Sequence, residues 1–138
     1  MTDPRDLTSP RSWLRKFRDA FHGMALGVRG QQSFSVHFAA AVAVIGCGWG
    51  LRVGLLEWLV LLLCITAVLA AEMFNSALES MAKAVSLEHQ PFLGEALDIG
   101  SAAVLVASLG AALVGGLLFT HRLGVLLGWW HDLIAMRC

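Results

Sequence analysis

Two glutamates and one asparagine lie in a segment of this chain that is apolar enough to cross a membrane. Glu72 follows the run WLVLLLCITAVLAA, and Asn75 and Glu79 come within the next two helical turns. A carboxylate near the centre of a bilayer costs about 2.5 kcal/mol or more, so such a residue rarely faces lipid. Positions three, four and seven apart share one face of a helix, so these residues and Ser76 form a polar stripe. The stripe must face protein, water or a ligand, so its residues are the candidates for chemistry.

The two glutamates lie at different depths, because seven helical residues rise about 10.5 Å. Glu79 is nearer the cytoplasmic end, where it can meet a hydrated Mg²⁺ ion with nucleotide phosphates, since this cation prefers carboxylate oxygen. Glu72 is deeper and can accept the proton of an alcohol held at the membrane interface. The alternative for Glu72 is a buried carboxyl that hydrogen-bonds across helices for packing. The alternative for Glu79 is a carboxylate in water at the level of the lipid headgroups.

Composition predicts an all-α integral membrane protein. Of the 138 residues, 57% are hydrophobic and only 14% are charged, which is too apolar for an ordinary soluble domain. A span needs roughly 20 mostly apolar residues, and three segments qualify, at about 34–51, 58–81 and 99–119. Residues 11–28 carry aromatic and apolar side chains at helical spacing between basic ones, which predicts an amphipathic helix on the membrane surface.

The predicted organisation is one membrane domain with two short flanking segments. Residues 1–10 are expected to be a disordered leader, residues 11–120 the membrane domain, and residues 121–138 a tail in the outer interface. Between the second and third spans, residues 86–94 are expected to form a break, where Pro91 stops a helix.

The basic residues predict the orientation in the membrane. Only Arg52 lies between the first and second spans, whereas six basic residues precede the first span: Arg5, Arg11, Arg15, Lys16, Arg18 and Arg29. Because positive residues favour the cytoplasmic side, we expect the N-terminus and the loop after Lys83 to be cytoplasmic. The C-terminus is then expected outside.

A second group of polar residues opens the third span. Asp98 and Ser101 lie three residues apart. Asp98 is either a helix N-cap or a carboxylate at the same depth as Glu79. His89, in the preceding loop, lies on the side where a nucleotide would dock. The sequence contains no Walker loop, zinc-ligand spacing or nucleophile elbow.

Three blocks of sequence together resemble the prokaryotic diacylglycerol kinase family, which includes the undecaprenol kinases of Gram-positive bacteria. They are EMFNSALES at 72–80, a short loop with Glu88 and His89, and LDIGSAAV at 97–104. The resemblance covers most of residues 13–119.

This resemblance implies a homotrimeric, three-span membrane kinase with a surface helix, in the bacterial cytoplasmic membrane. It implies transfer of the γ-phosphate of ATP, with Mg²⁺, to a lipid alcohol of the diacylglycerol or undecaprenol type; no nucleic-acid partner is expected. By motif position Glu72 corresponds to the catalytic base, and Glu79 and Gln31 to the metal-binding positions. Ser101 is the candidate contact for the lipid substrate. The positions that correspond to the nucleotide site are Asn75, Glu79, Glu88, His89 and Asp98.

Four positions depart from the family pattern. Leu97 replaces a lysine that contacts phosphate, and Gln31 replaces the second metal-binding glutamate. Lys83 stands in place of an aspartate, and Glu95 in place of a basic residue. Because phosphoryl transfer depends on neutralising the charge around the transferred group, these changes predict a weakened kinase, unless Lys83 or Arg29 reaches the phosphates.

Three interpretations therefore stay open. The first is a lipid kinase, and the second is a non-catalytic protein of the same fold that binds nucleotide or lipid. The third is a small proton-coupled transporter that uses an intramembrane glutamate. The short outer loop and the block LDIGSAAV at 97–104 argue against the third.

Overall fold

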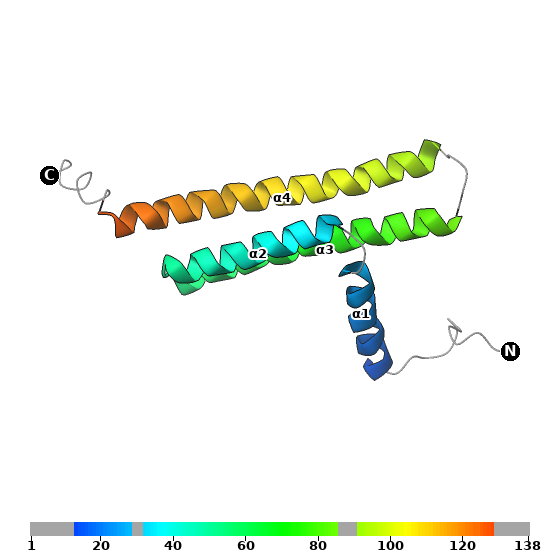
Figure 1. Ribbon diagram of the computed structural model, residues 1–138, viewed down its shortest axis with the longest axis horizontal. Helices are drawn as coiled ribbons and strands as arrows, with labels where there is room; N and C mark the ends of the chain where they lie inside the picture. Colours follow the sequence, from blue (N-terminus) through cyan, green and yellow to red (C-terminus); the bar gives the residue numbers. More distant parts are fainter. Residues whose placement is uncertain (1–12, 29–31, 86–90, 129–138) are drawn as a thin grey trace.

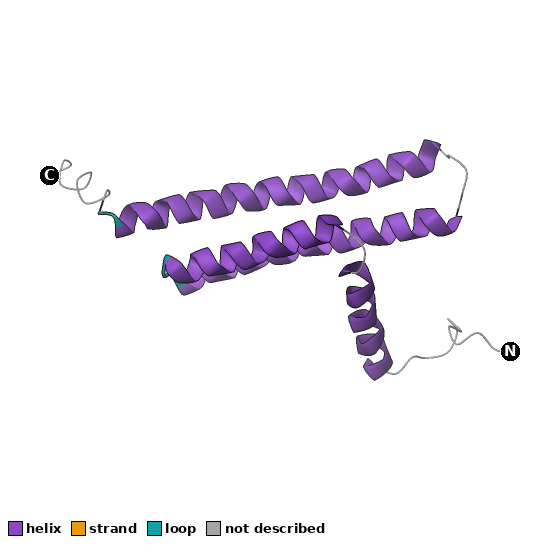
Figure 2. Ribbon diagram, viewed as in Figure 1, coloured by secondary structure: helices purple, strands orange, loops and turns teal. Residues whose placement is uncertain are grey.

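The computed structural model describes residues 13–28, 32–85 and 91–128. These residues form helices, with turns at 51–54 and 127–128 and no strand among them, so the all-α prediction is confirmed for the described part of the chain (Figure 2). The four helices are α1 (Trp13–Val28), α2 (Gln32–Gly50), α3 (Leu55–Val85) and α4 (Pro91–Leu126).

Three of these helices are long and apolar enough to cross a membrane, namely α2, α3 and α4. The sequence prediction of three spans is therefore confirmed by length and composition. In Figure 1 the three helices run along one another, and α1 stands across their direction. Helix α3 packs along α4 and also against α2, so α3 is the central element of the bundle. The polar stripe lies on this central helix.

The ends of the helices differ from the predicted spans. Pro91 begins α4 and does not stop a helix, because a proline in the first helical turn has no N–H to leave unpaired. Asp98 consequently lies inside α4, so its interpretation as an N-cap is wrong. At its other end α4 continues to Leu126, so the third span and the start of the predicted tail form one helix.

A polar cluster joins the α2–α3 turn to α4 at the end of the bundle remote from the stripe. Arg122 on α4 forms an ion pair with Glu57 on α3, with 3.1 Å between Nε and Oε2. A second nitrogen of Arg122 donates to the carbonyl of Arg52 at 3.0 Å, and the backbone N–H of Gly54 donates to Glu57. Arg52 has a φ of 50°, a left-handed conformation that these contacts hold in place. The cluster fixes the α2–α3 turn against α4.

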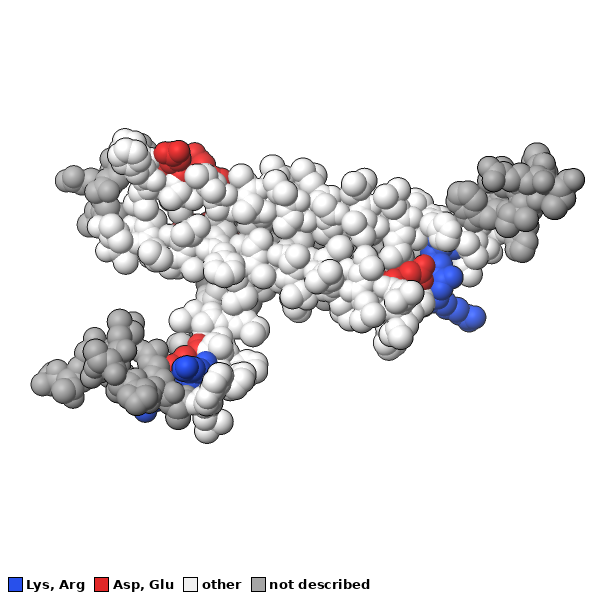
Figure 3. Space-filling view, turned by 180° about the vertical axis from the view of Figure 1, so that it is seen from behind, with Lys and Arg blue, Asp and Glu red and all other residues white. Residues whose placement is uncertain are grey.

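Most of the apolar surface of the bundle is uncovered in a single chain. Only 11% of each span is buried within the chain. Figure 3 shows a broad uncharged surface between charged groups near the two ends of the bundle. Lipid or further protein must therefore cover this surface, as the hydrophobic effect requires.

Candidate active site

The polar stripe of α3 faces the interior of the protein. Glu72 is 1% exposed, Ser76 5% and Asn75 7%, and Glu79, one turn further along, is half-buried. Burial of three polar residues in succession on an apolar helix keeps them away from lipid, as their transfer free energies demand. The spacing of these residues along α3 puts them on one face of the helix, and packing of α3 against α4 and α2 covers that face.

A glycine on α4 brings the two helices into close contact at Asn75. A Cβ atom at Gly100 would lie 2.6 Å from Asn75 Oδ1 and 2.9 Å from Leu78 Cδ1, so only glycine fits there without a shift. The amide nitrogen of Asn75 donates to Glu79 Oε1 at 3.2 Å. The contact of Asn75 with Gly100 and its hydrogen bond to Glu79 therefore contribute to the position of the Glu79 carboxylate.

This close contact leads to a first prediction. We expect Gly100→Ala to displace Asn75 and with it the Glu79 carboxylate, and to destabilise the fold by about 1–3 kcal/mol through overpacking. The measurement is thermal unfolding in detergent. Gly110→Ala is the matched control, because no atom lies within 4 Å of its added Cβ. Equal behaviour of the two variants would contradict the role given to Gly100.

Glu72 is the most enclosed polar residue of the site. Neither of its carboxylate oxygens has a hydrogen-bond partner among the described residues. The side chain that approaches it is His37 on α2, with 3.9 Å between His37 Nε2 and Glu72 Oε2. His37 is not among the site residues predicted from the sequence. An ionisable side chain inside a predicted span was the signal that could have identified it.

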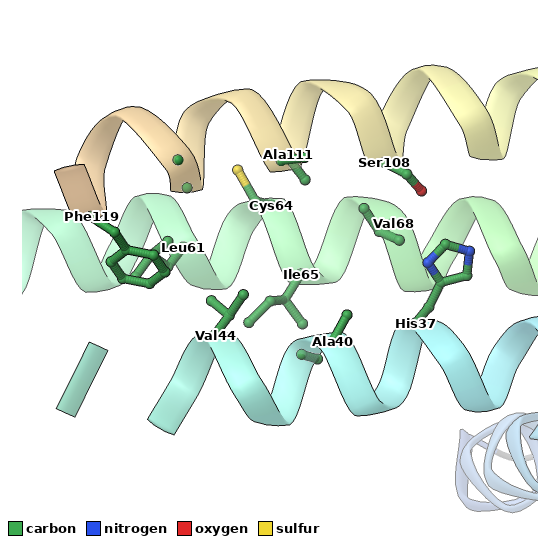
Figure 4. Close-up of a pocket in the computed structure, with 14 residues that line it drawn as sticks. His37, Ala40, Val44, Leu61, Cys64, Ile65, Val68, Ser108, Ala111 and Phe119 are labelled. Atoms are coloured by element: carbon green, nitrogen blue, oxygen red, sulfur yellow. The ribbon is translucent and has the colours of Figure 1, made fainter. Parts of the chain in front are cut away.

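An apolar groove of about 300 Å³ runs between α2, α3 and α4. In Figure 4 His37 lies near one end of the groove and Phe119 near the other. Ser108 contributes a buried hydroxyl without a hydrogen-bond partner among the described residues. Small residues of α4 make room along its length: Ala111, Ala112, Gly115 and Gly116. Such a groove suits a hydrocarbon chain, and His37 connects it to Glu72.

The other predicted site residues fall into two groups. Asp98 and Ser101 are exposed on α4, and the Ser101 hydroxyl donates to the carbonyl of Leu97 at 3.0 Å within its own helix. Gln31, Glu88 and His89 lie outside the described residues, so the parts assigned to them stay predictions.

A magnesium site would use Glu79 with ligands from outside this helix. In the described ranges no three residues among histidine, cysteine, aspartate and glutamate are grouped so as to hold a metal ion. Mg²⁺ typically binds one or two carboxylates, several waters and the phosphates of a substrate. The half-buried Glu79 carboxylate, held by Asn75 at 3.2 Å, fits that requirement as a single protein ligand.

Comparison with known proteins shows which proteins this chain is similar to. Residues 18–119 match the family described as prokaryotic diacylglycerol kinase. The chain is similar to an undecaprenol kinase of Bacillus subtilis, with 29% identity over 122 residues that cover 86% of this chain and 99% of the relative. It is also similar to a diacylglycerol kinase of Synechocystis sp., with 33% identity over 106 residues, which cover 76% of this chain and 61% of that protein.

Proposed function

We propose a function for this chain on the basis of its family: the chain belongs to the prokaryotic diacylglycerol kinase family. The proposed function is transfer of the γ-phosphate of ATP to a lipid alcohol in the bacterial cytoplasmic membrane. The observation that carries the proposal is Glu72, which is 1% exposed on a membrane-length helix. Through His37 it adjoins an apolar groove. This arrangement suits a base that acts on a hydroxyl presented from the lipid phase.

In the proposed reaction Glu72 accepts the proton of the acceptor hydroxyl. The alcohol oxygen attacks the γ-phosphorus, and a new bond from this oxygen to phosphorus forms. The bond from phosphorus to the oxygen that bridges it to ADP breaks, so ADP leaves with that electron pair. Glu72 then releases its proton to water. A general base of this kind contributes about 10²–10⁴-fold to the rate.

Glu79 and Asn75 are proposed to serve the nucleotide side of the site. Asn75 holds one oxygen of Glu79 by its hydrogen bond of 3.2 Å, and the carboxylate held in this way is proposed to bind a cation. Mg²⁺ bound there would neutralise the charge on the phosphates during transfer. Asp98, Glu88, His89 and Gln31 complete the proposed nucleotide and metal contacts by their place in the sequence motifs.

The groove is proposed to hold the hydrocarbon chain of the acceptor, with Ser101 as a headgroup contact. The groove is apolar and lies within the spans, beside the proposed base. The names of the two relatives support undecaprenol and diacylglycerol as acceptors to test. A homotrimer is proposed as the working unit, which is supported by the large apolar surface that one chain leaves uncovered.

The deciding experiment uses purified full-length protein with Mg²⁺, ATP and a panel of lipid alcohols that includes undecaprenol and diacylglycerol. Mass spectrometry follows the phosphorylated lipid, and a coupled assay follows ADP. We expect ADP and phosphorylated lipid in equal amounts. Nucleotide binding without phosphate transfer to any lipid would favour a non-catalytic protein of this fold, which the replacement of a lysine by Leu97 makes a real alternative.

Orientation in the membrane gives a second prediction. The basic residues before the first span predict a cytoplasmic N-terminus and an external C-terminus. A membrane-impermeant maleimide is therefore expected to label Cys138 on intact spheroplasts. It is not expected to label a Ser86→Cys variant in a Cys138→Ser background until the membrane is opened. The reverse pattern would place the proposed nucleotide site on the side that lacks ATP.

A further inference from the structure

The Glu72 carboxylate needs a group that holds it in place. Its neighbour in the stripe, Asn75, donates its amide to Glu79 at 3.2 Å, and Asn75 Oδ1 faces Gly100. Both oxygens of Glu72 are buried without a hydrogen bond in the described residues. A buried carboxylate in this condition is costly and is not oriented by a hydrogen bond, so a donor from another helix would satisfy and orient it.

His37 is placed to be that donor. Its Nε2 lies 3.9 Å from Glu72 Oε2, and its side chain is 20% exposed. In Figure 4 its ring projects from α2 into the space between the helices. A shift of about 1 Å brings the two atoms to hydrogen-bond distance. Catalytic hydrogen bonds are often long before substrate binds and shorten in the complex.

We propose that His37 is a positioning residue for Glu72, an inference that rests on the proposed function. The Nε2–H of His37 donates to Glu72 Oε2. This bond stops rotation of the carboxylate and leaves the second oxygen to take the proton of the acceptor hydroxyl. Because His37 also lines the groove, it holds the base in register with the chain of the acceptor. A misplacement of about 1 Å at such a site lowers the rate about 10²-fold.

The test compares three variants of the full chain with undecaprenol and with diacylglycerol in mixed micelles. His37→Leu keeps the bulk of the side chain and removes the donor, so we expect kcat to fall about 10²-fold with little change in KM for ATP. His37→Gln places an amide nitrogen near the position of Nε2 and is expected to regain most of kcat. The control is Phe38→Leu, an exposed residue next to His37 on α2, which should behave as the wild type.

A double-mutant cycle separates positioning from packing. If His37 acts through Glu72, adding His37→Leu to Glu72→Gln causes no further loss of kcat, because the two residues act as a unit. A residue that only supports the fold would lower the activity of both backgrounds by the same factor. Equal loss in both backgrounds, or a His37→Gln variant that folds and is as slow as His37→Leu, would overturn the proposal.

A measurement without turnover distinguishes failure of this inference from failure of the kinase proposal. In protein labelled with ¹⁵N-histidine, the ring signals of His37, assigned by their loss in His37→Leu, should move when Glu72 becomes glutamine. If they move and the wild type phosphorylates no lipid, the contact stands and the kinase proposal fails. If they do not move, His37 does not hold Glu72, whatever the activity.

Discussion

Replacing Glu72 with glutamine is expected to slow lipid phosphorylation by about 10²–10⁴-fold and to leave nucleotide affinity within about twofold of the wild type. Glutamine has the shape of glutamate and cannot accept the proton of the acceptor alcohol. Because Glu72 is 1% exposed, removal of its charge also removes a desolvation penalty. The variant should therefore fold at least as well as the wild type, and the loss should appear in kcat.

The chain provides a matched control for this variant on the same helix. Glu57→Gln makes the same chemical change near the start of α3, where Glu57 pairs with Arg122 at 3.1 Å. It is expected to lower thermal stability slightly and to leave kcat unchanged. Phosphate transfer by both variants is measured with saturating Mg²⁺-ATP, and nucleotide binding by isothermal titration. Full activity of Glu72→Gln would remove this residue from the chemistry, and equal losses in both variants would point to the fold.

Hydropathy and spacing predict much of this fold, because each of the three long helices is a continuous apolar segment long enough to cross a membrane. They also predict that Glu72, Asn75 and Ser76 share a buried face, and the structure buries all three. The helix ends were predicted less well. Hydropathy marks the part of a helix in hydrocarbon, whereas backbone hydrogen bonds continue into the polar ends. This is why α4 begins at Pro91, eight residues before the predicted span.

The contacts of the site could not be read from the sequence, since they join distant segments. His37 meets Glu72 only because α2 packs on α3. Gly100 meets Asn75 only because α4 lies close along α3. Neither contact follows from helical periodicity, which relates residues of one helix alone. The roles of the catalytic and nucleotide residues came from the family motif, and they stay predictions until the variants are measured.

The second large effect on kcat is expected at two positions that depart from the family pattern, Leu97 and Gln31. We expect the double variant Leu97→Lys with Gln31→Glu to raise kcat with Mg²⁺-ATP by about 10–10²-fold, because these groups act where negative charge gathers during transfer. Leu97 lies on α4 three residues before Gly100, which contacts Asn75 beside Glu79. A lysine at position 97 is therefore within one helical turn of this cluster. The backbone carbonyl of residue 97 still accepts the hydrogen bond from the Ser101 hydroxyl, since only the side chain at position 97 changes.

The control for this gain is Ala96→Lys with Gln31→Glu, which adds the same charge one position earlier on α4. Residue 96 lies about 100° around the helix from residue 97, so its lysine faces another direction. If the wild type is already fast and neither double variant is faster, other cations neutralise the phosphates. Lys83, exposed near the end of α3, and Arg29 are then the residues to replace. If no variant phosphorylates any lipid although all of them fold, restoring the charges at positions 97 and 31 does not restore turnover, and the non-catalytic interpretation replaces the kinase proposal.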